Sequence, residues 1–212
     1  MSDESTIQIV TPRGPVTAIV AAVPQAPGGV VMVGGAGGGM HGPSGVYADL
    51  SERLPRLGLA ALRLDYRRPG VLNDCVADTL AGIDFLNGWH IARVALIGWS
   101  FGGAVVIRAG VLSPAVAGVA TVSSQTFGAE GVGLLAPKRL LLIHGTADAV
   151  LPATSSRALF DRARDPKELV LFEGDGHGIE SHRTQLLDTL YEWCKAVLLD
   201  EAPPPDQQAP SS

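Results

Sequence analysis

Short apolar runs alternate along the chain with stretches in which apolar residues recur at helical spacing. The runs VVMV (30–33), LAALRLD (59–65) and LLLI (140–143) are typical of strands that are buried on both faces of a sheet. The whole pattern predicts eight strands, the first two joined by a turn at 12–15, and they lie at 6–10, 16–23, 30–33, 59–65, 93–97, 116–122, 140–143 and 169–172. Apolar residues three and four positions apart predict five helices, at 46–57, 72–86, 101–112, 152–162 and 186–198.

This alternation of strand and helix is typical of an α/β fold, in which helices cover both faces of a mostly parallel, twisted sheet. We expect one domain over residues 1–199 and a disordered tail over 200–212, because EAPPPDQQAPSS at the end of the chain is Pro-rich and polar. Only about 15 residues separate the strand that ends near Ser123 from the strand that starts near Leu140, and a connection of that length holds no separate domain. The sequence therefore predicts a fold without a lid domain.

Composition and charge narrow the range of partners. The chain has 212 residues, and 46% of them are hydrophobic, which is enough for a core of three layers. A net charge of −5 argues against nucleic acid as a partner, because phosphate binding needs a basic face. The sequence has no run of about 18 apolar residues and no signal-peptide pattern, so we expect no membrane span and a cytoplasmic location. Cys75 and Cys194 lie in helix-like segments without a C-x-x-C pattern, and we expect both to be buried and reduced.

A glycine-rich loop follows the third predicted strand in VVMVGGAGGGMHGPSG (30–45), and two interpretations compete for it. The first is a dinucleotide site, since residues 37–42 form G-x-G-x-x-G and Asp65 lies near the place of a ribose-binding acid. The second is an oxyanion site for acyl transfer, to which such a loop supplies a backbone N–H. Pro43 follows the last glycine of the pattern, which should instead lie within the first turn of a helix. The dinucleotide interpretation is therefore disfavoured, and we expect no cofactor.

The second motif is GWSFGG (98–103), which lies where a predicted strand meets a predicted helix. The G-x-S-x-G pattern alone is weak, but a strand-to-helix turn that exposes Ser100 strains the backbone and crowds the residues around it. Only small residues fit two positions before and after such a serine, and Gly98 and Gly102 are there. Gly103 allows the helix to lie close to the sheet. This context favours a nucleophilic serine over an ordinary glycine-rich turn.

A serine nucleophile needs a base that is held by a carboxylate, and both residue types follow in the chain. Asp148 comes just after the strand at 140–143 in HGTADAVLP, and His177 comes just after the strand at 169–172 in GDGHG. Serine, acid and histidine thus all follow strands, at the carboxyl edge where open α/β sheets carry their chemistry. The sequence predicts that they form one site.

Other titratable residues compete for these roles. Asp175 is close to the predicted base, but on the same tight loop it would have to fold back on its own backbone. His182, which opens the last helix, is the rival base. We expect His144 to brace the acid loop, and His41 and His90 to be solvated. The sequence has neither H-E-x-x-H nor a cluster of ligand residues, so we expect no metal.

The motifs resemble those of the α/β-hydrolase superfamily over nearly the whole chain, to about Leu199. GWSFGG resembles the nucleophile elbow, HGTAD-x-x-x-P the acid loop, GDGHG the histidine loop, and DYRRPG (65–70) the loop after the family's fourth strand. In size and in the absence of a lid, the chain is similar to small serine esterases and dienelactone-hydrolase-like members. True dienelactone hydrolases have a Cys nucleophile, so their substrate specificity is not implied. Asp65 is then expected to be structural, holding the loop of Tyr66 and Arg67.

The resemblance also implies roles and an activity. In this family the loop after the third strand commonly reads His-Gly-x, and the N–H of x is an oxyanion donor. Residues 34–36 occupy these positions here, so the implied donors are the N–H groups of Ala36 and Phe101, beside a triad of Ser100, Asp148 and His177. The implied activity is hydrolysis of small carboxylic esters through an acyl-enzyme. Thioesters and amides pass through the same intermediate, and a non-catalytic binding protein of this fold is a further alternative. The sequence leaves the oligomeric state open.

Overall fold

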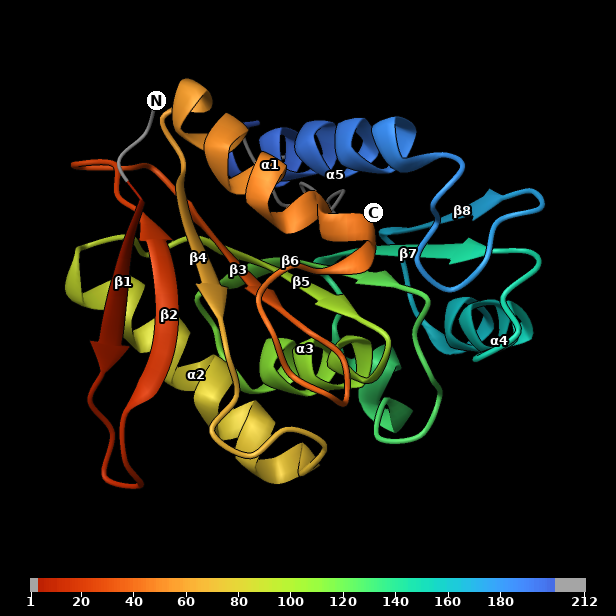
Figure 1. Cartoon of the computed structure of the whole chain (residues 1–212), viewed down its shortest axis with the longest axis horizontal. Coiled ribbons are helices and arrows are strands. Elements are labelled where there is room, and N and C mark those ends of the chain that lie inside the picture. The colour runs from red at the N-terminus through yellow and green to blue at the C-terminus, as the bar shows by residue number, and fades with distance from the viewer. Residues whose placement is uncertain (1–3, 201–212) are drawn as a thin grey trace, which may run out of the picture.

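An eight-stranded sheet forms the centre of the computed structural model, which describes residues 4–200 (Figure 1). The strands are β1 (Glu4–Ile9), β2 (Val16–Ala21), β3 (Gly29–Val33), β4 (Ala60–Leu64), β5 (Val94–Trp99), β6 (Val116–Val122), β7 (Arg139–Gly145) and β8 (Lys167–Phe172). Their order across the sheet is β1-β2-β4-β3-β5-β6-β7-β8. β2 is antiparallel to both β1 and β4, and all other neighbouring strands are parallel. The predicted α/β fold with a mostly parallel sheet is confirmed.

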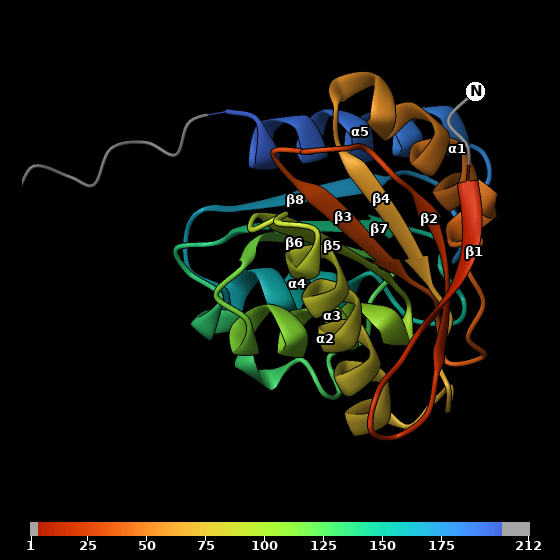
Figure 2. The same ribbon diagram turned by 90° about the vertical axis from the view of Figure 1, so that its left-hand side faces the viewer.

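Five α-helices cover the two faces of this sheet: α1 (Val46–Arg53), α2 (Leu72–Gly88), α3 (Phe101–Leu112), α4 (Thr154–Arg162) and α5 (Arg183–Leu198). α1 and α5 lie on one face, and α2, α3 and α4 lie on the other (Figures 1 and 2). Residues 4–200 also contain three short 3₁₀ helices, at Pro43–Gly45, Leu54–Leu57 and Glu130–Leu134. The sheet is therefore the middle of three layers.

The central strands serve two apolar cores, one on each face of the sheet. Along β3, Val31 and Val33 pack into the core under α2 and α3, whereas Val30 and Met32 pack into the core under α1 and α5. Successive side chains of a strand point to opposite faces of the sheet. When helices cover both faces, no side chain of the strand faces water, and apolar residues are favoured at every position. This explains why β3 is a continuous apolar run, with all of its residues buried.

Every predicted strand and helix is present in the structure, and α3 and β6 have the predicted bounds. The helix predicted over 46–57 is divided, because α1 ends at Arg53 and a 3₁₀ helix continues to Leu57. Pro55 stands in that 3₁₀ helix and has no N–H to donate to an α-helical acceptor. Only residues 123–138 lie between β6 and β7, so no separate lid domain is inserted there. The tail predicted over 200–212 falls outside the described residues from 201 onward.

Both cysteines are buried and unpaired, as predicted. Burial, reinforced by the charge of Asp78, raises the pKa of the Cys75 thiol to about 11, and burial raises the pKa of Cys194 as well. Both thiols therefore stay protonated and act as small apolar side chains. In the part of the chain that the structure describes, no helix is both long and apolar enough to cross a membrane.

Candidate active site

Ser100 lies on the turn between β5 and α3, in a backbone conformation that residues other than glycine rarely adopt. Its φ and ψ angles are 58° and −122°. Two hydrogen bonds hold the turn on either side: the N–H of Ser100 donates to Val122 O at 2.8 Å, and the N–H of Gly103 donates to Ser100 O at 3.0 Å. Such strain persists only where the surroundings enforce it, and here it leaves the serine partly exposed at the carboxyl edge of the sheet.

The glycines around this turn are required by close packing. A Cβ atom at Gly98 would overlap with the carbonyl of Gly102, and one at Gly102 would overlap with the carbonyl of Gly34. A Cβ atom at Gly103 would overlap with the side chain of Ser124, which follows β6. The predicted need for small residues at these positions is confirmed, and it results from contacts with neighbouring strands as well as from the turn itself.

Asp148 and His177 form a hydrogen-bonded pair, with His177 Nδ1 lying 2.8 Å from Asp148 Oδ2. The other carboxylate oxygen, Oδ1, accepts the N–H groups of Val150 at 2.8 Å and Leu151 at 2.9 Å. Burial alone would raise the pKa of Asp148, but these hydrogen bonds outweigh it, and the pKa lies below its ordinary value. Because Nδ1 faces a carboxylate, the neutral His177 ring carries its proton there, and its Nε2 is left free to act as a base.

Trp99 joins the histidine loop to the serine turn. Its indole Nε1 donates to the backbone oxygen of His177 at 3.1 Å, and the centres of the two rings are 5.5 Å apart. The residue directly before Ser100 thus fixes the loop that carries the histidine. Among the described residues, Ser100 Oγ makes no hydrogen bond to the His177 ring, and such contacts often shorten only when a substrate binds.

The two rival residues pair with each other instead of with the site. Asp175 Oδ2 lies 2.5 Å from His182 Nδ1, and the Asp175 carboxylate also accepts the N–H groups of Ser181 and His182 just before α5. Burial would raise the pKa of Asp175, but these hydrogen bonds hold it below its ordinary value. The structure therefore brings Asp148, and not Asp175, to the imidazole of His177.

The glycine-rich loop lies directly beside Ser100. A Cβ atom at Gly35 would be 3.4 Å from Ser100 Cβ, and a tight turn follows in which the N–H of Gly38 donates to Gly35 O at 3.0 Å. Ala36 is exposed within this turn. Within residues 4–200, its N–H donates to no protein acceptor, and the N–H of Phe101 is one of the unbonded donors at the start of α3.

The loop after β4 anchors the glycine-rich loop, which corrects the expectation for Asp65. Asp65 Oδ1 accepts the N–H of Gly39 at 2.8 Å, and the Tyr66 hydroxyl donates to Gly34 O at 3.3 Å. Arg67 is held by Asp78 instead: its N–H and its Nε donate to that carboxylate at 2.9 and 2.7 Å. Asp65 is structural as expected, but it holds a different loop. The available signal was its position at the end of a strand on the same edge of the sheet.

The remaining three histidines occupy two different environments. His144, at the end of β7, is fully buried and lies 3.2 Å from Asp148 Oδ2, 2.9 Å from Leu151 O and 2.7 Å from Ser156 Oγ. It braces the acid loop, as predicted. His41 and His90 are exposed. Across residues 4–200, no group of three or more His, Cys, Asp or Glu side chains is arranged to hold a metal ion.

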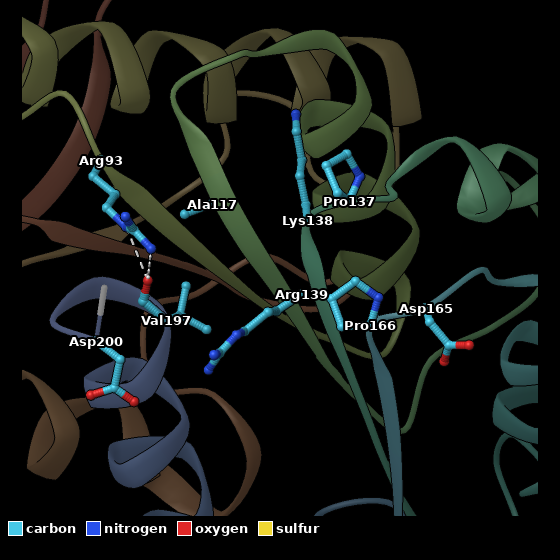
Figure 3. Close-up of a pocket in the computed structure, with 9 residues that line it drawn as sticks. All are labelled: Arg93, Ala117, Pro137, Lys138, Arg139, Asp165, Pro166, Val197 and Asp200. Atoms are coloured by element: carbon cyan, nitrogen blue, oxygen red, sulfur yellow. Dashed lines mark hydrogen bonds between the residues drawn. The ribbon is translucent and has the colours of Figure 1, made fainter. Parts of the chain in front are cut away.

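A cavity of about 590 Å³ lies at the other end of the strands from Ser100, at the amino ends of β5 to β8 (Figure 3). Arg93 donates from Nε and Nη2 to Val197 O, at 3.0 and 2.7 Å, near the end of α5. Lys138 donates to the carbonyls of Gly110 and Ser113 near the end of α3, and its burial lowers the pKa of its ammonium group. These two cations thus cap helix C-termini. No Ser, Cys or His is among the described lining residues, so the candidate active site is the carboxyl edge.

The comparisons agree with this architecture. YfhR of Escherichia coli, an uncharacterised protein, is 32% identical over 192 residues, which cover 70% of this chain and 67% of YfhR. The crystal structure of a dienelactone hydrolase from Anabaena variabilis matches 92% of this chain and 98% of that chain with a TM-score of 0.82, at 19% identity. The chain has the α/β-hydrolase fold of that structure, and it belongs to the same family as YfhR.

One similar structure is also described as having no lid. XC6422 from Xanthomonas campestris is described as an α/β serine hydrolase without a lid. Its crystal structure matches 95% of this chain over 98% of the XC6422 chain, with a TM-score of 0.75 and 18% identity. The uncharacterised protein Rv2307c of Mycobacterium tuberculosis is 32% identical over 66% of this chain. The chain covers only 60% of the length of that relative. No family model matches the sequence.

Proposed function

We propose that the protein is a Ser-His-Asp hydrolase that cleaves small carboxylic esters through an acyl-enzyme intermediate. The observation that carries the proposal is the Asp148–His177 pair, 2.8 Å apart, which is tied through Trp99 to the strained turn that bears Ser100. Three loops from three strands thus meet at one edge, with a nucleophile, a base and a charged acid. An ordinary turn would stabilise the fold equally well, so this combination of residues indicates a functional site.

Acylation begins when Ser100 Oγ attacks the ester carbonyl and gives its proton to His177 Nε2. The imidazolium that forms keeps its Nδ1–H on Asp148, whose negative charge stabilises it. The tetrahedral intermediate then collapses, the bond to the alcohol oxygen breaks, and the alcohol leaves with the proton from Nε2. Water then attacks the acyl carbon and gives its proton to the same nitrogen; when the second tetrahedral intermediate collapses, the bond from the acyl carbon to Ser100 Oγ breaks, Nε2 returns the proton to Oγ, and the carboxylic acid leaves.

The N–H groups of Ala36 and Phe101 stabilise the oxyanion in both halves of this reaction. Neither donates to a protein acceptor in the described chain, and they lie on the loop beside Ser100 and at the start of α3. A preorganised donor aimed at an oxyanion contributes about 2.7–4 kcal/mol to the stability of the transition state. This contribution explains why a glycine-rich loop, whose N–H groups are not covered by side chains, lies beside Ser100.

The substrate class follows from the absence of a lid domain and from the names of similar structures. Est1E of Butyrivibrio proteoclasticus and an esterase domain from Rhodothermus marinus share the fold, at 16% and 20% identity. Carboxylic esters are therefore the first substrates to test. Thioesters and amides react through the same tetrahedral intermediate, so a panel that includes both defines the preferred leaving group.

A fluorophosphonate probe tests the proposal directly. The wild-type protein should be labelled at a single residue, Ser100, and Ser100→Ala should lose both labelling and ester hydrolysis. Labelling and hydrolysis that persist at the wild-type level in Ser100→Ala would remove the mechanism. A folded wild-type protein that neither reacts with the probe nor hydrolyses any ester would be a binding protein built on the same fold.

A further inference from the structure

Two histidines share one oxygen atom of the acid. His177 Nδ1 lies 2.8 Å from Asp148 Oδ2, and His144 Nε2 lies 3.2 Å from the same atom. The second oxygen, Oδ1, already accepts two backbone N–H groups, from Val150 and Leu151. Both oxygens of this carboxylate are therefore fully engaged, and the two imidazoles compete at Oδ2.

The neighbours of His144 determine where its proton lies. Nε2 faces two acceptors, Asp148 Oδ2 and Leu151 O at 2.9 Å, so this nitrogen carries a hydrogen atom. In the neutral ring, Nδ1 is then an acceptor, and it receives the hydroxyl hydrogen of Ser156 at 2.7 Å. Ser156 belongs to α4, so the orientation of this fully buried ring is fixed from outside the acid loop.

The charged groups around the two rings are few. Asp148 is the only charged side chain that forms a hydrogen bond or ion pair with His144 or His177 in the described chain. Trp99, which packs on His177 from β5, offers an uncharged ring. Asp175, on the same loop as His177, is engaged by His182, and the exposed carboxylate of Glu180 lies beside Gly176 and Gly178 but forms no ion pair with either ring within residues 4–200. A change at His144 therefore reaches His177 mainly through Asp148.

We propose that His144 is a positioning residue that weakens the hold of Asp148 on the His177 ring. The catalytic consequence rests on the proposed function, but the competition at Oδ2 does not. A donor from His144 shares the carboxylate charge between two rings, so that Asp148 stabilises the His177 imidazolium less strongly. Removal of this donor therefore favours the imidazolium form of His177.

Two amide variants separate this role from simple packing. In His144→Gln the side-chain nitrogen reaches the place of Nε2 and keeps a donor for Asp148. In His144→Asn the nitrogen reaches only the place of Nδ1, near Ser156, and the donor to Asp148 is lost. Both variants bury an amide, so a loss of stability is common to them. His182→Gln is the matched control, since it removes an imidazole from the other histidine-paired carboxylate, Asp175.

Two readouts follow the effect. The first is the rate of fluorophosphonate labelling against pH, whose acidic limb reports protonation of the base. The second is the low-field proton resonance of His177 Nδ1–H, which needs no activity and is assigned by its loss in His177→Gln. In His144→Asn we expect the limb to move to higher pH by about half a unit or more, and the resonance to move downfield. His144→Gln and His182→Gln should stay near wild type in both.

The possible outcomes separate the two proposals. Wild-type values of both readouts in His144→Asn would overturn the role of His144 and leave it as a packing residue. Equal shifts in His144→Asn, His144→Gln and His182→Gln would also overturn it, because a general loosening would then be the cause. If the wild-type protein is not labelled at all, the proposed function fails, and the resonance alone decides the role of His144.

Discussion

The carboxylate of Asp65 accepts the backbone N–H of Gly39 at 2.8 Å, and this hydrogen bond ties the loop after β4 to the glycine-rich loop after β3. Tyr66 adds a second link at the other end, through its hydroxyl to Gly34 O at 3.3 Å. Ala36, whose N–H is a proposed oxyanion donor, lies between these two anchored ends. The aim of the donor therefore depends on side chains from another part of the chain.

Asp65→Ala should lower kcat for ester hydrolysis by about 10- to 100-fold with a smaller change in KM. A donor that is displaced by a fraction of an ångström loses much of its effect on the transition state and little on substrate binding. Asp65→Asn keeps an acceptor oxygen and should lose less. The control is Asp188→Ala, which removes only a surface ion pair with Arg53. Equal kinetics in Asp65→Ala and Asp188→Ala would refute the anchoring role.

Asp148→Asn should lower kcat by roughly three to four orders of magnitude, because an amide no longer selects the Nδ1–H tautomer of His177. Asp175→Asn should change kcat little, since Asp175 pairs with His182. It should instead lower the free energy of unfolding by about 1–2 kcal/mol, because its carboxylate accepts the backbone N–H groups of Ser181 and His182 just before α5. Steady-state kinetics and urea unfolding measure the two effects. A larger kcat loss in Asp175→Asn than in Asp148→Asn would reverse the assignment of the acid.

The same two carboxylates predict how stability depends on pH. Asp148 and Asp175 both have a pKa below their ordinary value of 3.8 in the folded protein. A lowered folded-state pKa stabilises the protein above the unfolded-state pKa, and this contribution disappears as the pH falls through the folded-state pKa. The free energy of unfolding should therefore be flat near neutral pH and should fall below about pH 4. Urea titrations between pH 3 and 7 test this, and Asp175→Asn should show a shallower fall than wild type.

The periodic pattern of the sequence predicts most of the fold because burial itself is periodic. β3 is an apolar run because both of its faces are covered, and α3 begins directly after Ser100 because the turn ends the strand there. The three residues of the candidate triad are also accessible to prediction. Parallel strands place their carboxyl ends on the same side of the sheet. Residues that follow those strands can therefore be predicted to lie close together, even when the paths of the loops are unknown.

The contacts that orient these residues could not be predicted in the same way. The hydrogen bonds from Asp65 to Gly39 and from His144 to Asp148 depend on the path of non-periodic loops. The position of His144 in the acid loop predicts that it braces this loop, but nothing in the local pattern marks its ring as a direct partner of the Asp148 carboxylate. The indole of Trp99 is equally ambiguous, since a core residue and a clamp on the histidine loop have the same sequence signal.

Substrate size is the last prediction. Residues 123–138 form the only connection between β6 and β7, and no lid domain is inserted there, so we expect a shallow cleft over Ser100. Each methylene of an acyl chain gains about 0.8 kcal/mol, or about fourfold in kcat/KM, only while it is removed from water. For p-nitrophenyl esters, kcat/KM should therefore peak at acyl chains of about two to four carbons and fall beyond about eight, without interfacial activation.

Phe127 provides a direct check on that expectation, because it lies between β6 and β7 and its side chain is 73% exposed. If the cleft is open, Phe127→Ser should leave kcat/KM for acetyl and butyryl esters unchanged, since short chains end before they reach outlying apolar surface. A preference for long acyl chains that disappears in Phe127→Ser would contradict the prediction. It would mean that residues 123–136 fold over the substrate as a small cover, and that the apolar side chain of Phe127 is exposed only until a long chain binds.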